Sequence, residues 1–144
     1  MRIAFFSDNF YPETSGISDS IIVLGKELAR RGHVITFYAA RYGPKEFALA
    51  GVPQEEPALG ENIHIVRFAS FRYPTGTGQG RLVIPLGVRS LRIARFRPDI
   101  LHTQLFFGVG LEALFASRIL RVPIIGTNHT VLKEYLKYAP IQAP

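Results

Sequence analysis

The sequence contains no cysteine, which excludes disulfide bonds, thiolate-bound metals and cysteine nucleophiles. It also has no apolar run near the roughly 18 uncharged residues that a membrane-spanning helix needs, so we expect no transmembrane helix. The opening MRIAFFSDNF meets Asp8 after a short apolar run and lacks the cleavage site of a signal peptide. These absences lead us to expect a cytoplasmic protein.

Several common catalytic and cofactor-binding signatures are missing as well. The sequence has neither the HExxH spacing of a zinc site nor the GxSxG turn of a serine hydrolase. Gly76, Gly78 and Gly80 form the only cluster similar to a dinucleotide-binding fingerprint, but no convincing strand precedes them. We therefore expect no metal site and no cofactor.

Acidic residues are absent from residues 62–98, although the same stretch contains seven arginines. The seven arginines give this stretch a charge of +7. Since the whole chain has a net charge of +6, the remainder has a net charge of −1. A segment that excludes acids and uses only arginine favours an anionic partner over general solubility. The arginines are Arg67, Arg72, Arg81, Arg89, Arg92, Arg95 and Arg97.

The 144 residues suit one domain, and 47% of them are apolar, including 11 Phe and 6 Tyr, which is enough to form a core. Short apolar runs predict five strands, over residues 2–7, 33–39, 63–68, 99–103 and 123–127. Apolar residues at helical spacing, bounded by stop signals, predict helices between them. One begins near Ile17 and ends before Gly32, and the others cover residues 87–96, 108–120 and 131–138.

The first of these helices has the clearest local signals. Its apolar residues recur on one narrow face, at Ile17, Ile21, Leu24 and Leu28. Ser18 or Asp19 is the expected cap at its start, and Gly32 is a good stop signal. Gly25 lies beside the apolar face, where a missing side chain lets a helix sit close to a sheet.

Residues 41–61 contain three prolines and three glycines and predict an irregular connection. Residues 71–87, rich in Gly, Thr and Pro, predict a long loop. Strands that alternate with helices predict an α/β fold, a doubly wound, Rossmann-like parallel sheet with helices on both faces and the strand 2–7 at its centre. A complete domain of this class continues for another unit or two, so we expect residues 1–144 to be a single truncated domain.

In parallel α/β sheets, ligands bind beyond the carboxyl ends of the strands. This rule selects three loops: residues 8–17, 103–110 and 128–131. Ser15, Gly16 and Ile17 stand at the start of a helix, where unpaired amides and a partial positive charge suit a phosphate, although a glycine there can also be a simple turn residue. His102 and His129 lie at the ends of neighbouring strands and are expected either to face the cleft or to pack in the core.

Four segments match a known family in order and spacing: RIAFFSDNFYPETSGIS, LGKELARRGHVITFYAA, RPDILHTQ and GLEALFASRILRVPIIGTNHT. Together they resemble the N-terminal domain of family-4 retaining glycosyltransferases, which have the GT-B fold and use nucleotide-sugar donors. The resemblance covers nearly the whole chain and is weakest over residues 41–87. It implies that the chain is the N-terminal, acceptor-side half of a GT-B fold.

The resemblance implies roles for individual residues. Gly16 matches the family glycine whose backbone approaches the donor diphosphate, with Ser15 in place of a second glycine that the family often has. His129, in GTNHT, matches a histidine beside the transferred sugar, where it positions the sugar and stabilises the transition state. His102 and Gln104, in ILHTQ, match a strand-end pair that borders the acceptor cleft.

The resemblance also implies a second, C-terminal domain that holds most of the nucleotide, typically with two glutamates eight positions apart. No such pair occurs in this chain. We therefore expect the 144 residues alone to transfer no sugar, and the full-length enzyme to pass a sugar, with retention, from a nucleotide sugar to a lipid or glycan acceptor.

Two other interpretations stay open. The chain could be a non-catalytic module of a bipartite transferase that binds the acceptor or anchors the protein to a membrane. It could also be a nucleotide-binding domain of an oxidoreductase, which the missing glycine fingerprint and the absence of an acidic residue after the second strand disfavour.

Three arginines recur every three residues in the predicted helix 87–96, and by the repeat of about 3.6 residues they share one stripe. The stripe consists of Arg89, Arg92 and Arg95, with Arg81 just before it. Basic residues mixed with exposed apolar ones suit an anionic membrane surface, whereas such a stripe can also be a solvated helix face. Nothing else is similar to a nucleic-acid-binding module. We expect a peripheral contact with the inner face of the membrane and no nucleic-acid partner.

Overall fold

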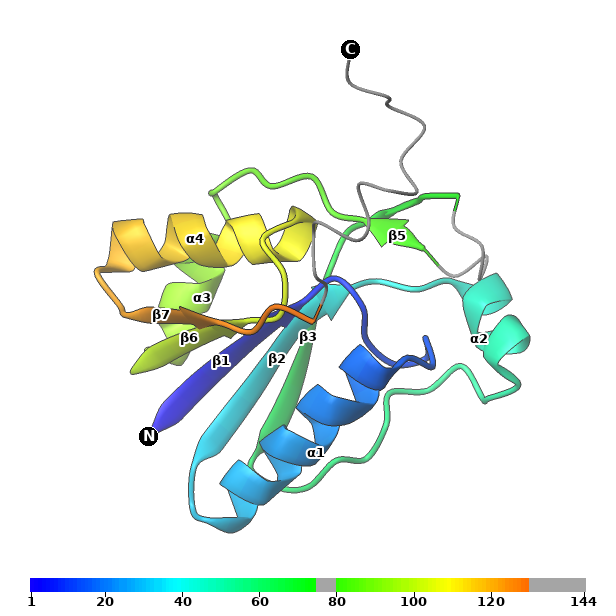
Figure 1. Cartoon of the computed structure of the whole chain (residues 1–144), viewed down its shortest axis with the longest axis horizontal. Helices are drawn as coiled ribbons and strands as arrows, with labels where there is room; N and C mark the ends of the chain where they lie inside the picture. The colour runs from blue at the N-terminus through cyan, green and yellow to red at the C-terminus, as the bar shows by residue number, and fades with distance from the viewer. Residues whose placement is uncertain (75–79, 130–144) are drawn as a thin grey trace.

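The computed structural model describes residues 1–74 and 80–129. A five-stranded parallel sheet forms its centre (Figure 1). From one edge to the other the strands are β3 (Ile63–Phe68), β2 (Val34–Ala40), β1 (Arg2–Ser7), β6 (Ile100–Thr103) and β7 (Ile124–Gly126). The prediction of a parallel sheet with the first strand at its centre is confirmed.

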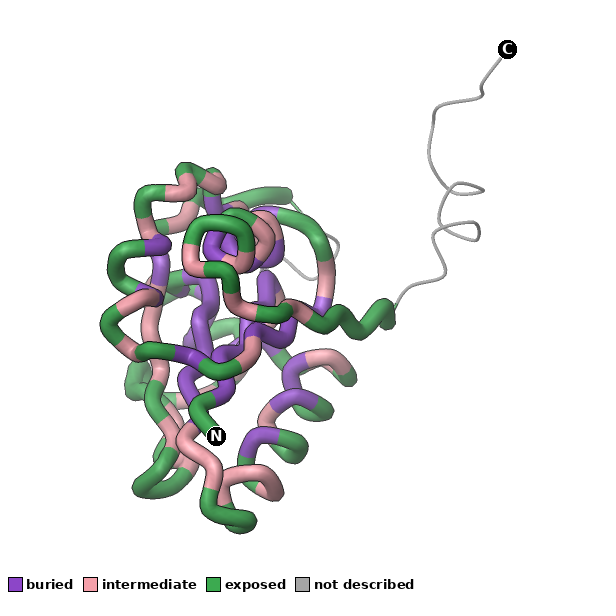
Figure 2. Tube along the Cα trace, turned by 90° about the vertical axis from the view of Figure 1, so that its left-hand side faces the viewer, coloured by how far each residue is buried: buried purple, intermediate pink, exposed green. Residues whose placement is uncertain are grey.

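Helices cover both faces of this sheet. On one face lies α1 (Gly16–Arg30), and on the other lie α3 (Ser90–Phe96) and α4 (Gly108–Leu120) (Figure 1). Side chains alternate along a strand, so Phe5 enters the core beneath α1 and Phe6 enters the core beneath α4. The buried residues gather in the middle of the molecule (Figure 2). The predicted doubly wound α/β class is confirmed.

The start of α1 differs from the prediction in one residue that matters for the site. Its cap is Ser15, not Ser18 or Asp19, because Ser15 and Ser18 bond reciprocally: each backbone N–H donates to the other's hydroxyl oxygen at 3.2 Å. Gly25 faces the sheet as predicted, since a Cβ there would lie 2.4 Å from the ring of Phe37.

The prediction that residues 41–61 are irregular is wrong at α2 (Pro44–Ala50). Proline at the first helical position suits a helix start, and the Glu46 carboxylate accepts a hydrogen bond from the amide of Gly43 at 2.7 Å. Gly51, with a φ of 67°, ends the helix in the left-handed conformation. These are local start and stop signals that the proline-rich surroundings obscured.

The segment predicted as one long loop, residues 71–87, contains a short antiparallel pair, β4 (Phe71–Arg72) and β5 (Arg81–Leu82). The following helix begins at Ser90 rather than at residue 87, which leaves Arg89 at its cap position. The predicted strands 33–39, 99–103 and 123–127 are shifted or shortened at their ends. The predicted helix 131–138 lies outside the described residues.

The helix α4 is buried on its inner side, where Val109, Ala113 and Ala116 pack in the core. Phe115 and Ile119 are exposed on its outer side, whereas Glu112 is fully buried. One carboxylate oxygen of Glu112 accepts hydrogen bonds from the Arg89 guanidinium at 2.6 Å and from the amides of Leu86 and Gly87. A buried ion pair therefore fastens the segment before α3 to the inner side of α4.

We expect Glu112→Ala to lower the free energy of unfolding by about 3 kcal/mol or more, because it removes the counter-ion of the largely buried Arg89 and the acceptor of the Leu86 and Gly87 amides. Urea unfolding of the two proteins measures the difference. Glu27→Ala is the matched control, since Glu27 pairs with Arg30 and Arg31 on the exposed side of α1 and should matter far less. Equal effects of the two substitutions would contradict the structural role of Glu112.

Candidate functional site

The carboxyl ends of the three strands β1, β6 and β7 meet at one edge of the sheet (Figure 1). The amide of Gln104 donates to the carbonyl oxygen of Phe6 at 3.0 Å, and the amide of Thr127 donates to that of Thr103 at 2.9 Å. These bonds continue the parallel pairing past the strands. The loops that follow the three strands are therefore neighbours, as the sequence predicted.

The amino end of α1 presents unsatisfied hydrogen-bond donors at this edge. The amide of Ser18 is used by the Ser15 hydroxyl, but within residues 1–74 and 80–129 nothing accepts a hydrogen bond from the amides of Gly16 and Ile17. A Cβ placed on Gly16 would meet no atom within 4 Å. Packing therefore does not require glycine here, and the helix start is open to an anion.

Three predicted site residues form one hydrogen-bonded chain. The Nε2 atom of His129 lies 2.6 Å from Oε1 of Gln104, and the amide nitrogen of Gln104 lies 3.5 Å from Nε2 of His102. The same nitrogen of His102 lies 2.7 Å from the hydroxyl of Thr127. The structure therefore brings His102, Gln104 and His129 together, from two strands of the sheet.

His102 and His129, the two histidines linked through Gln104, differ in environment. His102 is buried against the ring of Phe5, and burial, with the nearby His129, lowers the pKa of His102. A neutral His102 accepts the Gln104 amide hydrogen, and Gln104 can then accept the hydrogen of His129. His129 itself is exposed. These hydrogen bonds thus hold the exposed imidazole of His129 in a fixed orientation, available to a ligand at the edge of the sheet.

Asp8 is a residue of this edge that our sequence analysis did not select. It follows β1 directly and is 93% buried, with one carboxylate oxygen accepting from the amide of Val109 at 2.8 Å. The other oxygen is buried without a hydrogen-bond partner. Burial raises the pKa of Asp8 to about 6, against the opposing effect of the Val109 and Gly110 amides. Its position immediately after the first strand was the available signal.

Asp8 also decides which helix can receive an anion. Its carboxylate occupies the amino end of α4, where Val109 and Gly110 lie in the first turn. The corresponding position of α1 holds only the Ser15 hydroxyl. Of these two helix starts at the same edge of the sheet, that of α1 is the open one.

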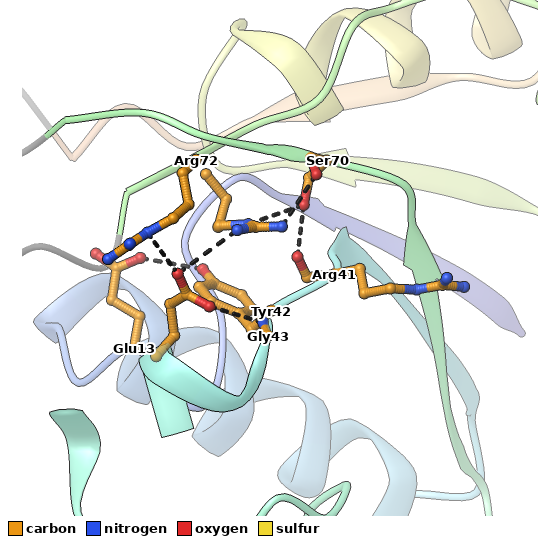
Figure 3. A network of polar contacts seen from close by, with 8 residues as sticks. Glu13, Arg41, Tyr42, Gly43, Ser70 and Arg72 are labelled. Atoms are coloured by element: carbon orange, nitrogen blue, oxygen red, sulfur yellow. Dashed lines mark hydrogen bonds and ion pairs between the residues drawn. The ribbon is translucent and has the colours of Figure 1, made fainter. Parts of the chain in front are cut away.

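The predicted surface stripe of arginines is corrected by two ion pairs. The Arg81 side chain, 13% exposed, pairs with buried Glu46 at 3.5 Å and donates to Ser70, in a network that also includes Arg72 (Figure 3). The Arg89 side chain, 17% exposed, pairs with Glu112. Both therefore point inward because buried carboxylates attract them. Arg92 and Arg95 remain exposed on α3.

Across the described part of the chain, no helix is long and apolar enough to cross a membrane. The same residues bring together no group of three or more His, Asp or Glu side chains that could hold a metal ion.

Comparison with known proteins identifies a family to which the sequence is similar. The profile of Glycosyltransferase Family 4 matches residues 14–143. The chain is 30% identical, over 140 residues, to the alpha-monoglucosyldiacylglycerol synthase of Streptococcus pneumoniae, covering 96% of this chain and 29% of that protein. It is 28% identical, over 134 residues, to the GDP-mannose-dependent alpha-mannosyltransferase of Mycobacterium tuberculosis, covering 90% and 32%. The chain thus spans about a third or less of the length of these relatives.

A solved structure shares the fold. The calicheamicin glycosyltransferase CalG4 matches 99% of this chain and 38% of its own length, with a TM-score of 0.51 and 17% sequence identity. At that identity the likeness concerns the fold alone.

Asp8→Asn should change how stability depends on pH. The folded pKa of Asp8, about 6, lies above its ordinary value of 3.8, so the folded state binds this proton more tightly than the unfolded state. The free energy of unfolding therefore falls as pH rises from about 4 to above 6, by about 3 kcal/mol for a shift of roughly two units. Asparagine does not titrate, so the variant should gain stability relative to the wild type over this interval. Urea unfolding at pH 4, 5.5 and 7 tests this, and parallel pH profiles for the two proteins would contradict it.

Proposed function

The chain belongs to glycosyltransferase family 4, and from this we propose that the complete protein transfers a sugar from a nucleotide-sugar donor to a lipid or glycan acceptor, with retention of configuration. The observation that carries the proposal is the open start of α1 at the same sheet edge as the hydrogen-bonded chain of His129, Gln104 and His102. This chain supplies the N-terminal, acceptor-side domain. A C-terminal domain in the remainder of the protein supplies most contacts to the nucleotide, so the 144 residues alone transfer no sugar.

The first part of the site acts on the leaving group. In the transfer, the bond between the anomeric carbon and the diphosphate breaks, and its electron pair leaves with the diphosphate. The acceptor hydroxyl oxygen bonds to the anomeric carbon on the same face, and its proton passes to the departing phosphate. The amides of Gly16 and Ile17 are aimed outward from the helix start, where they can stabilise the negative charge that develops. This scheme requires no metal or cofactor from the chain.

The second part of the site acts on the sugar and the acceptor. Gln104 and His102 are almost fully buried, so they hold the exposed His129 in place at little further entropic cost. We assign His129 to the transferred sugar, where its ring stabilises the transition state, and His102 with Gln104 to the border of the acceptor cleft.

Two substitutions in the complete protein should separate these parts. His129→Ala should lower kcat about tenfold or more while the KM for the donor stays within about threefold, because His129 acts mainly on the transition state. Gly16→Val should instead raise the donor KM about tenfold, because a branched side chain blocks the approach of phosphate to the amides. Steady-state kinetics with UDP-glucose and GDP-mannose measure both, and thermal unfolding serves as the control. Unchanged kinetics in both variants would refute the assignment of the site.

We also propose that the protein lies in the cytoplasm and contacts an anionic membrane from one side. The relative from Streptococcus pneumoniae is named for a diacylglycerol glycolipid, which supports a lipid acceptor. Val88, just before α3, is 67% exposed, and Leu91, on α3, is 77% exposed. Arg92 and Arg95 are exposed on the same helix. We call these four residues the α3 patch. Each arginine near an anionic membrane contributes about 1 kcal/mol, while the apolar residues can enter the headgroup region.

Co-sedimentation with vesicles tests this contact. Binding of the complete protein should require anionic lipid and weaken with added salt. The double substitution Arg92→Glu and Arg95→Glu should reduce binding by more than about tenfold. The matched control is Lys26→Glu on α1 with Arg31→Glu at the end of that helix, which makes the same charge change on the opposite face of the sheet. Binding to neutral vesicles at equal strength, or equal losses in the two variants, would refute the role of the α3 patch.

A further inference from the structure

The loop between β1 and α1, residues 8–15, is held by side chains that lie far from it in the sequence. Tyr42 follows β2, and Arg67 belongs to β3. The two side chains contact the loop at different points, and the aromatic ring of Tyr42 lies 5.6 Å from the guanidinium carbon of Arg67. Together Tyr42 and Arg67 hold the loop from one side, and we call these two residues the brace.

The Tyr42 hydroxyl joins three parts of the loop. It donates to the Glu13 carboxylate at 3.0 Å, accepts from the amide of Phe10 at 3.3 Å, and lies 3.3 Å from the carbonyl oxygen of Asp8. Glu13, which is 93% buried, also accepts from the side chain of Asn9 at 2.7 Å. Figure 3 shows Glu13 and Tyr42 within one polar network. Burial and the Glu13 charge raise the pKa of Tyr42, so the hydroxyl remains a donor.

The Arg67 guanidinium joins the loop to the sheet. It donates to the carbonyl oxygen of Tyr11 in the loop at 2.7 Å and to that of Ala40 at the end of β2 at 3.0 Å. Glu56 accepts two further hydrogen bonds from it, at 2.7 and 2.8 Å, and fixes its plane. The side chain is only 10% exposed. A planar, five-donor cation is the side chain suited to bridging two carbonyls and a carboxylate at once.

The loop is in turn fastened to the first turn of α1. The Ser18 hydroxyl lies 2.7 Å from the carbonyl oxygen of Glu13 and donates to it. Ser18 shares that turn with Gly16 and Ile17, whose amides are open. A displacement of Glu13 therefore changes where these amides point.

We propose that Tyr42 and Arg67 are positioning residues for the donor diphosphate, acting through residues 8–15 on the amides of Gly16 and Ile17. This inference rests on the proposed function, in which those amides receive the diphosphate. Neither brace residue touches the substrate. Their contribution is to keep the loop in the one arrangement that aims both amides outward, which avoids reorganisation when the donor binds.

The test compares two tyrosines in the complete protein. Tyr42→Phe removes only the hydroxyl that holds the loop. Tyr38→Phe is the matched control, since Tyr38 is also buried, stacks on Phe6 and makes no hydrogen bond through its hydroxyl to any described residue. We expect Tyr42→Phe to raise the KM for UDP-glucose or GDP-mannose about fivefold and to leave kcat within about twofold. The reason is that a loosened loop lowers the fraction of protein molecules whose Gly16 and Ile17 amides are placed to bind the donor. Amide hydrogen exchange over residues 8–17 should become at least about fivefold faster. Tyr38→Phe should change neither quantity.

A second variant and the amide hydrogen exchange data distinguish a failure of the positioning role of Tyr42 and Arg67 from a failure of the proposed function. Arg67→Lys keeps the charge but cannot bridge both carbonyls, so it should produce the same two changes as Tyr42→Phe. If the wild type transfers no sugar from either donor, the proposed function fails, and titration with UDP or GDP then replaces KM as the readout. Unchanged exchange over residues 8–17 would overturn the brace. Faster exchange with unchanged donor KM or nucleotide affinity would overturn its role in positioning the diphosphate.

Discussion

The burial of β1 on both faces is the constraint on which the rest of the structure depends. A strand whose consecutive residues Phe5 and Phe6 are both fully buried needs apolar partners above and below the sheet. α1 meets this need on one face, and α3 with α4 meets it on the other. Since crossover connections keep the neighbouring strands parallel, all the carboxyl ends lie at one edge. The loops with exposed polar groups therefore gather there.

Buried carboxylates then set the shape of that edge. Asp8 takes the amino end of α4, Glu13 holds the first loop, and Glu46 and Glu112 each attract an arginine from the acid-free segment. Each acid is buried where it can accept hydrogen bonds from backbone amides, side-chain donors or cations, which offsets its desolvation. The desolvation is only partly offset at Asp8, whose second carboxylate oxygen has no hydrogen-bond partner and whose pKa is raised. The loops at this edge are thus held to the interior by hydrogen bonds and ion pairs of buried carboxylates.

One consequence is an asymmetry between two helix starts of the same edge. Both offer amides and a partial positive charge, but the Asp8 carboxylate occupies the start of α4 through the Val109 and Gly110 amides, whereas the amides of Gly16 and Ile17 in α1 are open. The exposed His129, oriented through Gln104, lies at the same edge of the sheet. In the proposed function, this edge is where the diphosphate departs beside the bound sugar.

Much of this arrangement is predictable from short-range patterns. The five strands, the close packing at Gly25 and the convergence of His102, Gln104 and His129 follow from apolar runs and from the rule that parallel strands end at one edge. The family resemblance rested on the same segments. The α2 helix was missed although Pro44 and Gly51 mark its ends, because the prolines around it suggested irregular backbone.

Long-range pairing accounts for the remaining differences. Arg81 and Arg89 were expected on the surface with Arg92 and Arg95, and nothing local distinguishes the four. Glu46 and Glu112, 35 and 23 residues away, withdraw the first two into the interior. The importance of Asp8 and Tyr42 arises in the same way, from helices and loops that meet them only after folding. The sequence by itself determined most strands and helices and the sheet edge where the candidate site lies, because these depend on the periodicity of apolar residues along the chain. Only the tertiary structure decided which charges are neutralised and which donors stay open, because a buried charge takes its partner from whatever the fold places within a few ångströms of it.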